Sequence, residues 1–265
     1  MQDRNMSRIF VIGNEKGGAG KTTCAMHLIS ALLDQGYKVA SIDTDLRQLS
    51  LTNYIKNREL YNQKNPDKLV PQPCHFYLTT KGENDEDANL LLFEQKLCDA
   101  RNLAEYIVID TPGYHSLLSK LAHSYADTII TPINDSFMDL DVMAKINPDD
   151  LSIISPSIYS QMVWEQKMQR AARDQSSIEW IVMRNRLSQI DAVNKRNVGY
   201  VLEKLAKRIS FKIAPGFSER VVFRELFLYG LTLLDLTTAN LGKPLALSHV
   251  AARQELRDFL TCLGI

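Results

Sequence analysis

The sequence predicts a three-layer α/β fold in which helices flank a mostly parallel, twisted sheet. Short β-branched runs alternate with amphipathic helical patterns along the 265 residues, and strands separated by helices form parallel βαβ units. Hydrophobic residues make up 45% of the chain, which is enough apolar material for one large core. We therefore expect residues 1–265 to form a single domain.

Six short runs rich in β-branched and aromatic residues are expected to be strands. They are Ile9–Ile12, Lys38–Ile42, Tyr106–Ile109, Thr128–Pro132, Trp180–Met183 and Phe211–Ile213. Helices are expected at Thr22–Gln35, which stops before Gly36, and at Ile190–Arg208. Residues 62–87 are polar and contain three prolines and an acidic cluster, so we predict a surface excursion there.

Charge and composition exclude several classes of protein. The 31 Lys and Arg residues balance 31 Asp and Glu residues, so any DNA binding has to come from a local patch. The four cysteines form no C-x-x-C pair, which argues against a zinc or iron–sulfur site. No run approaches the roughly 18 apolar residues of a membrane span, and the first eight residues mix both charges. We expect a cytoplasmic protein with no membrane partner.

A phosphate-binding loop follows the first expected strand and opens the first helix. Its glycines let backbone N–H groups turn toward an anion, and the helix N-terminus adds partial positive charge. Lys21 is expected to reach the terminal phosphates of ATP, and the Thr22 hydroxyl to ligate Mg²⁺. Glu15 replaces the first glycine of the strict Walker pattern, and Lys16 is an added lysine. The loop residues are Lys16, Gly17, Gly18, Ala19, Gly20, Lys21, Thr22 and Thr23.

Two acidic motifs follow at the carboxyl ends of later strands, where an open α/β sheet binds its ligands. The first is the D-x-D pair Asp43 and Asp45. The second is Asp110 in a D-T-P-G sequence, preceded by four strand residues. Asp110 is therefore our candidate for the Walker B residue that holds Mg²⁺ directly or through water.

These motifs resemble the ParA/MinD family of deviant Walker A P-loop ATPases, in which Lys16 corresponds to the signature lysine. Within this family the chain resembles the MipZ group of division-plane positioning ATPases over nearly its whole length. The segments that carry the resemblance are Asn14–Lys16, Asp45–Gln48, Pro132–Phe137, Met183–Leu187, Phe223–Leu226 and Gly230–Asp235.

The resemblance implies an ATP-gated switch in which two subunits sandwich two nucleotides. Lys16 would then act on the phosphates of the partner subunit, so that slow hydrolysis is coupled to dimerisation. Asp45 would position the attacking water, and Asp43 would support the Mg²⁺ shell. Asn185, just after an expected strand, would read the adenine base.

The resemblance also implies partners: non-specific nucleoid DNA bound by the dimer, the partition protein ParB, and FtsZ, whose assembly would be inhibited away from midcell. The protein would be nucleoid-associated and enriched toward the cell poles through ParB. Residues 195–258 carry eleven Lys and Arg against six Asp and Glu. Lys195, Arg196, Arg220 and Arg224 are our candidate DNA contacts, although a solvated helix face explains such residues equally well.

Other functions remain open on the sequence alone. A ParA-type plasmid or chromosome partition ATPase would share every nucleotide residue, and a P-loop metabolic synthetase of the dethiobiotin type would share the loop. A MinD-like membrane ATPase fits less well, because residues 248–265 balance their charges. We expect Cys24 and Cys98 to be packing residues, His115 to be a cap or surface group, and Met162, Trp164 and Met168 to pack a helix onto the body.

Overall fold

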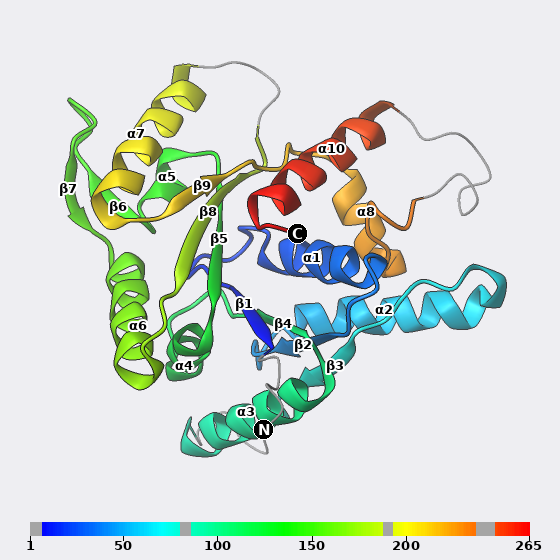
Figure 1. Ribbon diagram of the computed structural model, residues 1–265. Coiled ribbons are helices and arrows are strands. Elements are labelled where there is room, and N and C mark those ends of the chain that lie inside the picture. The colour runs from blue at the N-terminus through cyan, green and yellow to red at the C-terminus, as the bar shows by residue number, and fades with distance from the viewer. Residues whose placement is uncertain (1–6, 80–85, 188–192, 237–246) are drawn as a thin grey trace.

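The computed structural model describes residues 7–79, 86–187, 193–236 and 247–265. Its centre is a seven-stranded, fully parallel sheet with the strand order β3-β2-β4-β1-β5-β8-β9 (Figure 1). The strands are β1 (Arg8–Ile12), β2 (Val39–Asp43), β3 (Cys74–Tyr77), β4 (Tyr106–Asp110), β5 (Thr128–Asn134), β8 (Glu179–Asn185) and β9 (Lys212–Ala214). The expected three-layer α/β fold is confirmed.

Helices cover both faces of this sheet, and each face has its own apolar core (Figure 1). On one face lie α1 (Lys21–Asp34), α2 (Ser50–Lys64), α8 (Val222–Tyr229) and α10 (Leu247–Cys262). On the other lie α3 (Glu86–Leu103), α4 (Leu117–Tyr125), α6 (Ile158–Asp174) and α7 (Val193–Ile209). Two single-turn elements, η1 (Pro66–Lys68) and α5 (Phe137–Leu140), lie between them in the chain.

The central strands are apolar at successive positions because both of their faces are covered. In β1, Phe10 and Ile12 belong to the core under α1, whereas Ile9 and Val11 belong to the core under α4. Side chains therefore alternate between two cores rather than between core and water. None of the helices in the described ranges is both long and apolar enough to cross a lipid bilayer.

All six expected strands are present, but the interpretation of residues 62–87 was wrong in part. Strand β3 lies inside that stretch and pairs with β2 along the sheet edge. The sequence did not indicate β3 as a strand because His75 interrupts its apolar pattern. In the structure the His75 ring contacts Ser41 Oγ at 2.8 Å and Thr52 Oγ1 at 3.0 Å. Residues 80–85 of the expected excursion, and residues 190–192 of the helix expected at 190–208, lie outside the described residues.

A second, antiparallel sheet was not expected. It consists of β6 (Ala144–Ile146) and β7 (Ile153–Pro156), which form a hairpin before α6.

The packing expectation for α6 was also only partly right. Met162 is buried, but Trp164 is 60% exposed and Met168 is 53% exposed. Cys24 is buried as expected, whereas Cys98 is exposed.

One buried ion pair connects α2 to the segment after α8. Arg58 donates to both carboxylate oxygens of Asp235, at 2.7 and 2.9 Å, and to the Gly230 carbonyl at 3.0 Å. Burial on its own would raise the pKa of Asp235, but hydrogen bonds and charge from Arg58 outweigh it and hold the pKa below its usual range. Thr232 adds two further donors to the same carboxylate.

We predict that Asp235→Asn destabilises the fold by about 3–5 kcal/mol, because it leaves the Arg58 guanidinium buried without a counter-charge. Since the folded-state pKa is depressed, this stability is present above the unfolded pKa of about 3.9 and is lost as pH falls through the folded pKa. Urea unfolding at pH 7 and at lower pH measures it. Glu59→Gln, an exposed change in α2, is the matched control. A full-sized difference that persists well below pH 3 would contradict the assignment to ionised Asp235.

Candidate nucleotide site

The loop between β1 and α1 has the backbone of an anion cradle. Gly18 and Gly20 have φ values of 74° and 91°, in the left-handed region where a Cβ is disfavoured. A Cβ on Gly20 would also collide with the amide of Asn185. Gly20 is the N-cap of α1 and offers no side-chain cap, so the first-turn N–H groups are available to a bound anion.

Thr22 and Asp110 form the part of the site that fits a magnesium ion. The Thr22 hydroxyl donates to Asp110 Oδ2 at 2.6 Å, and Asp110 Oδ1 is buried without a hydrogen-bond partner. Burial, with the nearby Asp43 charge, raises the pKa of Asp110 to about 7. A hydroxyl and an orphaned buried carboxylate oxygen are hard oxygen donors of the kind that Mg²⁺ prefers. These two residues therefore fit the ion.

Lys21 lies beside this pair and is almost completely buried. Its Nζ donates to the Lys16 carbonyl at 3.1 Å, so the chain of Lys21 folds back under the loop. Burial lowers the pKa of Lys21, while the charges of Asp110 and Asp45 act in the opposite direction. A bound phosphate would offset the cost of keeping this ammonium charged and buried.

The two acids of the D-x-D motif have different surroundings. Asp43 is fully buried, and its oxygens accept from Asp45 N at 3.0 Å, Thr52 N at 2.8 Å and Thr52 Oγ1 at 2.9 Å. These donors give Asp43 a structural role that ties β2 to α2, and its place in a metal shell stays a prediction. Asp45 is half-buried and accepts from the backbone N–H groups of Arg47 and Gln48 through Oδ1.

Lys16 does not reach into the cavity of its own loop. Its Nζ lies 3.1 Å from Asp139 Oδ1 and donates to the Met138 carbonyl at 3.1 Å. Asp139 is buried, and Ser136 Oγ donates to its second oxygen at 2.5 Å. The lysine is therefore held against α5 by a preformed carboxylate.

Two adjoining cavities surround the loop and share Gly20, Thr23, Arg186 and Phe227. The first has a volume of about 340 Å³ and is also lined by Lys21, Thr22, Asp45 and Asp110. The second has a volume of about 260 Å³ and is lined by Asn185 and by α8. Asn185 Nδ2 donates to the Ala19 carbonyl at 2.8 Å, which aims the amide oxygen away from the loop. The first cavity has room for phosphates, and the second has room for a base.

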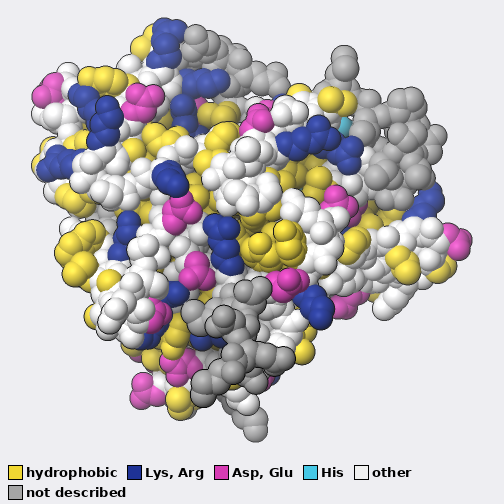
Figure 2. Space-filling view, in the orientation of Figure 1, with side chains coloured by type: hydrophobic (Ala, Val, Ile, Leu, Met, Phe, Trp, Pro, Cys, Tyr) yellow, Lys and Arg dark blue, Asp and Glu magenta, His cyan; other side chains and the backbone are white. Residues whose placement is uncertain are grey.

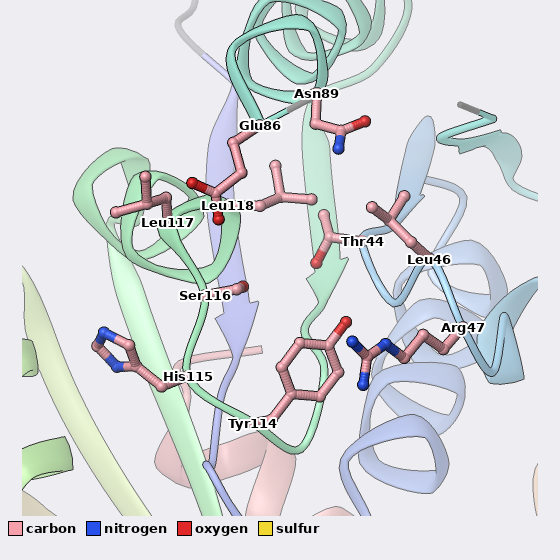
Figure 3. A pocket seen from close by; sticks show the side chains of 10 residues that line it. All are labelled: Thr44, Leu46, Arg47, Glu86, Asn89, Tyr114, His115, Ser116, Leu117 and Leu118. Atoms are coloured by element: carbon pink, nitrogen blue, oxygen red, sulfur yellow. The ribbon is translucent and has the colours of Figure 1, made fainter. Parts of the chain in front are cut away.

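The loop after β2, which carries Asp45, and the loop after Asp110 also line a third hollow, of about 240 Å³. Figure 3 shows the Arg47 guanidinium and the Tyr114 ring directed toward one another across its mouth. The Arg47 carbon lies 4.9 Å from the ring centroid, which is cation–π distance. This contact joins the two acidic loops.

The four candidate DNA contacts lie in two places. Lys195 and Arg196 lie in the first turn of α7, where Arg196 is exposed. Arg220 pairs with Glu255 at 2.6 Å and Arg224 with Glu219 at 3.1 Å, and both line the base-sized cavity. Lys243, which contributes to the basic excess of the sequence, lies outside the described residues.

Sequence reasoning assigned no structural contact to three residues that shape the loop. Asn14 is buried, donates to the Pro132 carbonyl at 2.7 Å and accepts from Lys16 N at 2.8 Å. Asp139 holds Lys16, and Glu15 contacts the exposed His115 at 2.8 Å. Asn14 lies within a motif segment that carries the family resemblance, but Asp139 is separated from Lys16 by more than 120 residues. No local pattern could have paired them.

Comparison with known proteins supplies the family. A family model described as ATPase MipZ matches residues 8–265. The chromosome partitioning protein ParA of Myxococcus xanthus is 27% identical over 161 residues, which are 53% of this chain and 57% of that protein. The septum site-determining protein MinD of Neisseria meningitidis is 30% identical over 146 residues, 49% of this chain and 54% of that protein. The aligned part thus spans little more than half the length of these relatives.

Solved structures agree on the fold. The septum site-determining protein MinD of Pyrococcus horikoshii, complexed with Mg-ADP, superposes with a TM-score of 0.57 at 20% identity and covers 87% of this chain and 89% of its own. The family is established by the match of the MipZ model to residues 8–265, and the phosphate-binding loop and the acidic motifs agree with it. The chain belongs to the MipZ family of ATPases, within the ParA/MinD group of positioning and partition ATPases.

Proposed function

We propose that the chain is a slow ATPase that works as an ATP-dependent dimerising switch and positions the division site by inhibiting FtsZ assembly. The observation that carries the proposal is the position of Lys16. Its ammonium group lies on Asp139, outside the cavity that holds Lys21 and Thr22. A loop lysine that does not serve its own phosphates is suited to serve those of a second subunit.

Within one subunit, the proposed mechanism assigns each side chain a position around the nucleotide. Lys21 binds the terminal phosphates, and Thr22 and Asp110 hold magnesium, which neutralises phosphate charge when bound. Asp45 accepts a proton from the attacking water and orients it, because its second oxygen is left over from the turn contacts to Arg47 and Gln48. Asn185 reads the base at the edge of the loop.

Between subunits, Lys16 completes the site. It leaves Asp139, crosses the interface and stabilises charge on the transferring phosphoryl group, so hydrolysis requires assembly. Met138, whose carbonyl accepts from Lys16, is 74% exposed.

The biological setting is part of the proposal: the dimer binds nucleoid DNA without sequence preference, and ParB recruits the protein toward the poles. Size-exclusion chromatography with ADP and with a non-hydrolysable ATP analogue tests the switch, since only the analogue should give a dimer. Inhibition of FtsZ polymerisation by the analogue-bound protein separates this function from that of a ParA-type partition ATPase. That second candidate is supported by the ParA relative.

We predict separable roles for the two loop lysines. Lys21→Ala should lose ATP affinity by at least about 100-fold, because it removes a buried cation from the phosphates. Lys16→Ala should bind ATP as a monomer, fail to dimerise, and lose roughly 10³-fold or more in turnover, as expected for a charge supplied in trans. Equilibrium binding and size-exclusion chromatography measure both effects.

The matched variant for Lys16 is Asp139→Asn, which keeps the shape of the contact and removes the carboxylate charge. It should dimerise with the ATP analogue at a roughly two- to fivefold lower protein concentration, since a partly exposed ion pair is worth about 0–1 kcal/mol. Normal dimerisation of Lys16→Ala with ATP would refute the role of Lys16 in trans.

For Asp45 we predict a trapped state. Asp45→Ala should bind ATP and Mg²⁺ and form a stable dimer, while turnover falls by roughly 10²–10⁴-fold, the usual contribution of a positioned base. Phosphate release and sedimentation velocity on the same sample measure the two effects. If the variant were instead a monomer unable to bind ATP, Asp45 would belong to the binding site or to the fold.

DNA binding should depend on salt through the phosphates that the dimer neutralises. On the Asp45→Ala background, log affinity should fall linearly with log salt. Loss of a true contact should flatten the slope by about 0.9 per phosphate, or up to about 1.8 when both subunits of the dimer lose it. Alanine variants at Lys195, Arg196, Arg220 and Arg224 test this, with Lys96→Ala in α3 as the control. The effect should be smaller at Arg220 than at Arg224, because the Glu255 pair leaves Arg220 less exposed.

Two outcomes would refute these DNA contacts. One is equal affinity of the ADP-bound monomer and the ATP-bound dimer. The other is an unchanged salt slope in all four variants, which would identify the basic residues as a solvated face.

A further inference from the structure

A large apolar hollow lies between α6 and the end of α7, on the face of the sheet opposite α1. Its volume is about 660 Å³, within the range of ligand sites. The apolar lining comes from Pro156, Trp164, Met168, Trp180 and Ile209. Trp180 closes the floor and is fixed by a hydrogen bond from Nε1 to Thr131 Oγ1 at 3.0 Å.

Trp164 and Met168 form the outer wall and are the part that the fold does not explain. They lie four residues apart on α6, so they share one helix face, while the core-facing side of the helix carries Met162 and Val163. Both side chains are more than half exposed. A tryptophan and a methionine side by side in water are an unpartnered apolar surface rather than scattered exposure.

The lining of this hollow carries two cations, Lys167 and Arg208, and one acid, Glu165. Lys167 Nζ donates to the Ser210 carbonyl at 3.3 Å, and Arg208 Nη1 donates to the Ile153 carbonyl at 2.6 Å. Neutral carbonyl groups orient both cations, so their positive charge is available to an incoming carboxylate. Lys204, Lys207 and Glu203 are exposed nearby on α7 but do not line the hollow. Figure 2 shows hydrophobic, Lys/Arg and Asp/Glu side chains intermixed on the side of the molecule where Figure 1 places α6 and α7.

This surface is separate from the nucleotide site. The described residues that line it are absent from the two cavities around the phosphate loop, and α6 packs in the core on the opposite side of the sheet from α1. Occupation of the hollow therefore does not compete with nucleotide.

We infer that this hollow is a docking site for a segment of a partner protein that places a bulky apolar side chain between acidic residues. The apolar side chain enters between Trp164, Met168 and Trp180, and the carboxylates face Lys167 and Arg208. Charge complementarity selects this occupant over a second copy of the chain, because two copies meeting here would bring two linings of net positive charge together. Trp and Arg are also the side chains that dominate binding energy in small interfaces. The inference does not depend on the proposed function.

The test uses the full chain and a phage-displayed library of random 12-residue peptides. Selected peptides should carry an aromatic or leucine side chain flanked by at least two Asp or Glu. Their affinity, measured by fluorescence anisotropy of synthetic copies, should fall at least tenfold for Trp164→Ala and for Arg208→Glu. Gln169→Ala, an exposed change in the same helix, should leave it unchanged. Thermal unfolding should be similar for all variants, since these side chains are on the surface.

Any of four results would overturn the inference. Selection could yield no peptide, or it could yield peptides without acidic residues. Selected peptides could bind Trp164→Ala as tightly as the unmodified chain. Sedimentation velocity without nucleotide could show a dimer that Trp164→Ala dissociates, which would make the surface a contact between copies. Loss of ATP-driven dimerisation would refute the proposed function and leave this inference untouched.

Discussion

The register of the parallel strands at their carboxyl ends is the constraint on which the nucleotide site depends. Asp110 pairs with Ile12 of β1 on one side and with Asp43 of β2 on the other, so three loops leave the sheet at one level. Hydrogen bonds then lock the loops to each other: Thr111 donates to the Ile12 carbonyl, and Thr44 donates to the Asp110 carbonyl. Because a slip of one residue turns every side chain to the opposite face, Thr22 and Asp110 meet only in this register.

Most of the fold could be predicted from the sequence, because buried parallel strands are continuous apolar runs bounded by helices. Five of the six predicted strands are of this kind, including the four that carry the site, whereas β9 is an edge strand with Lys212 and Ile213 exposed. Strand β3 lies at the sheet edge, where polar His75 is satisfied by neighbours that only the tertiary structure supplies. The β6–β7 hairpin consists of very short strands, one of which ends in Pro156. The expected burial of Trp164 was wrong for another reason. Helical spacing places Met162 and Trp164 on different faces of α6, so both could not face the core.

The site was predictable to the extent that its chemistry is local in sequence. The glycines, Lys21, Thr22 and the acid that ends β4 follow one another in fixed motifs, and the fold brings Thr22 and Asp110 into contact. The environments of the acids were not predictable, because they depend on the donors that other elements present. Asp43 is saturated by Thr52 from α2, whereas Asp110 keeps one oxygen without a partner. The same carboxylate chemistry thus serves structure in β2 and leaves an oxygen available to a ligand in β4.

The contact between Lys16 and Asp139 is strong enough to orient the lysine and weak enough to release it. The Lys16 side chain is 32% exposed, whereas the Asp139 side chain is only 8% exposed, so solvent reaches this ion pair from the side of the lysine. Asp139 loses little when the lysine leaves, because Ser136 remains hydrogen-bonded to its second oxygen and the Asn134 amide lies 3.4 Å from the first. In the proposed dimer, the phosphate of the second subunit would present a higher negative charge than one carboxylate and would therefore outcompete Asp139 for the lysine. The buried and already satisfied carboxylate therefore keeps the lysine in place without trapping it.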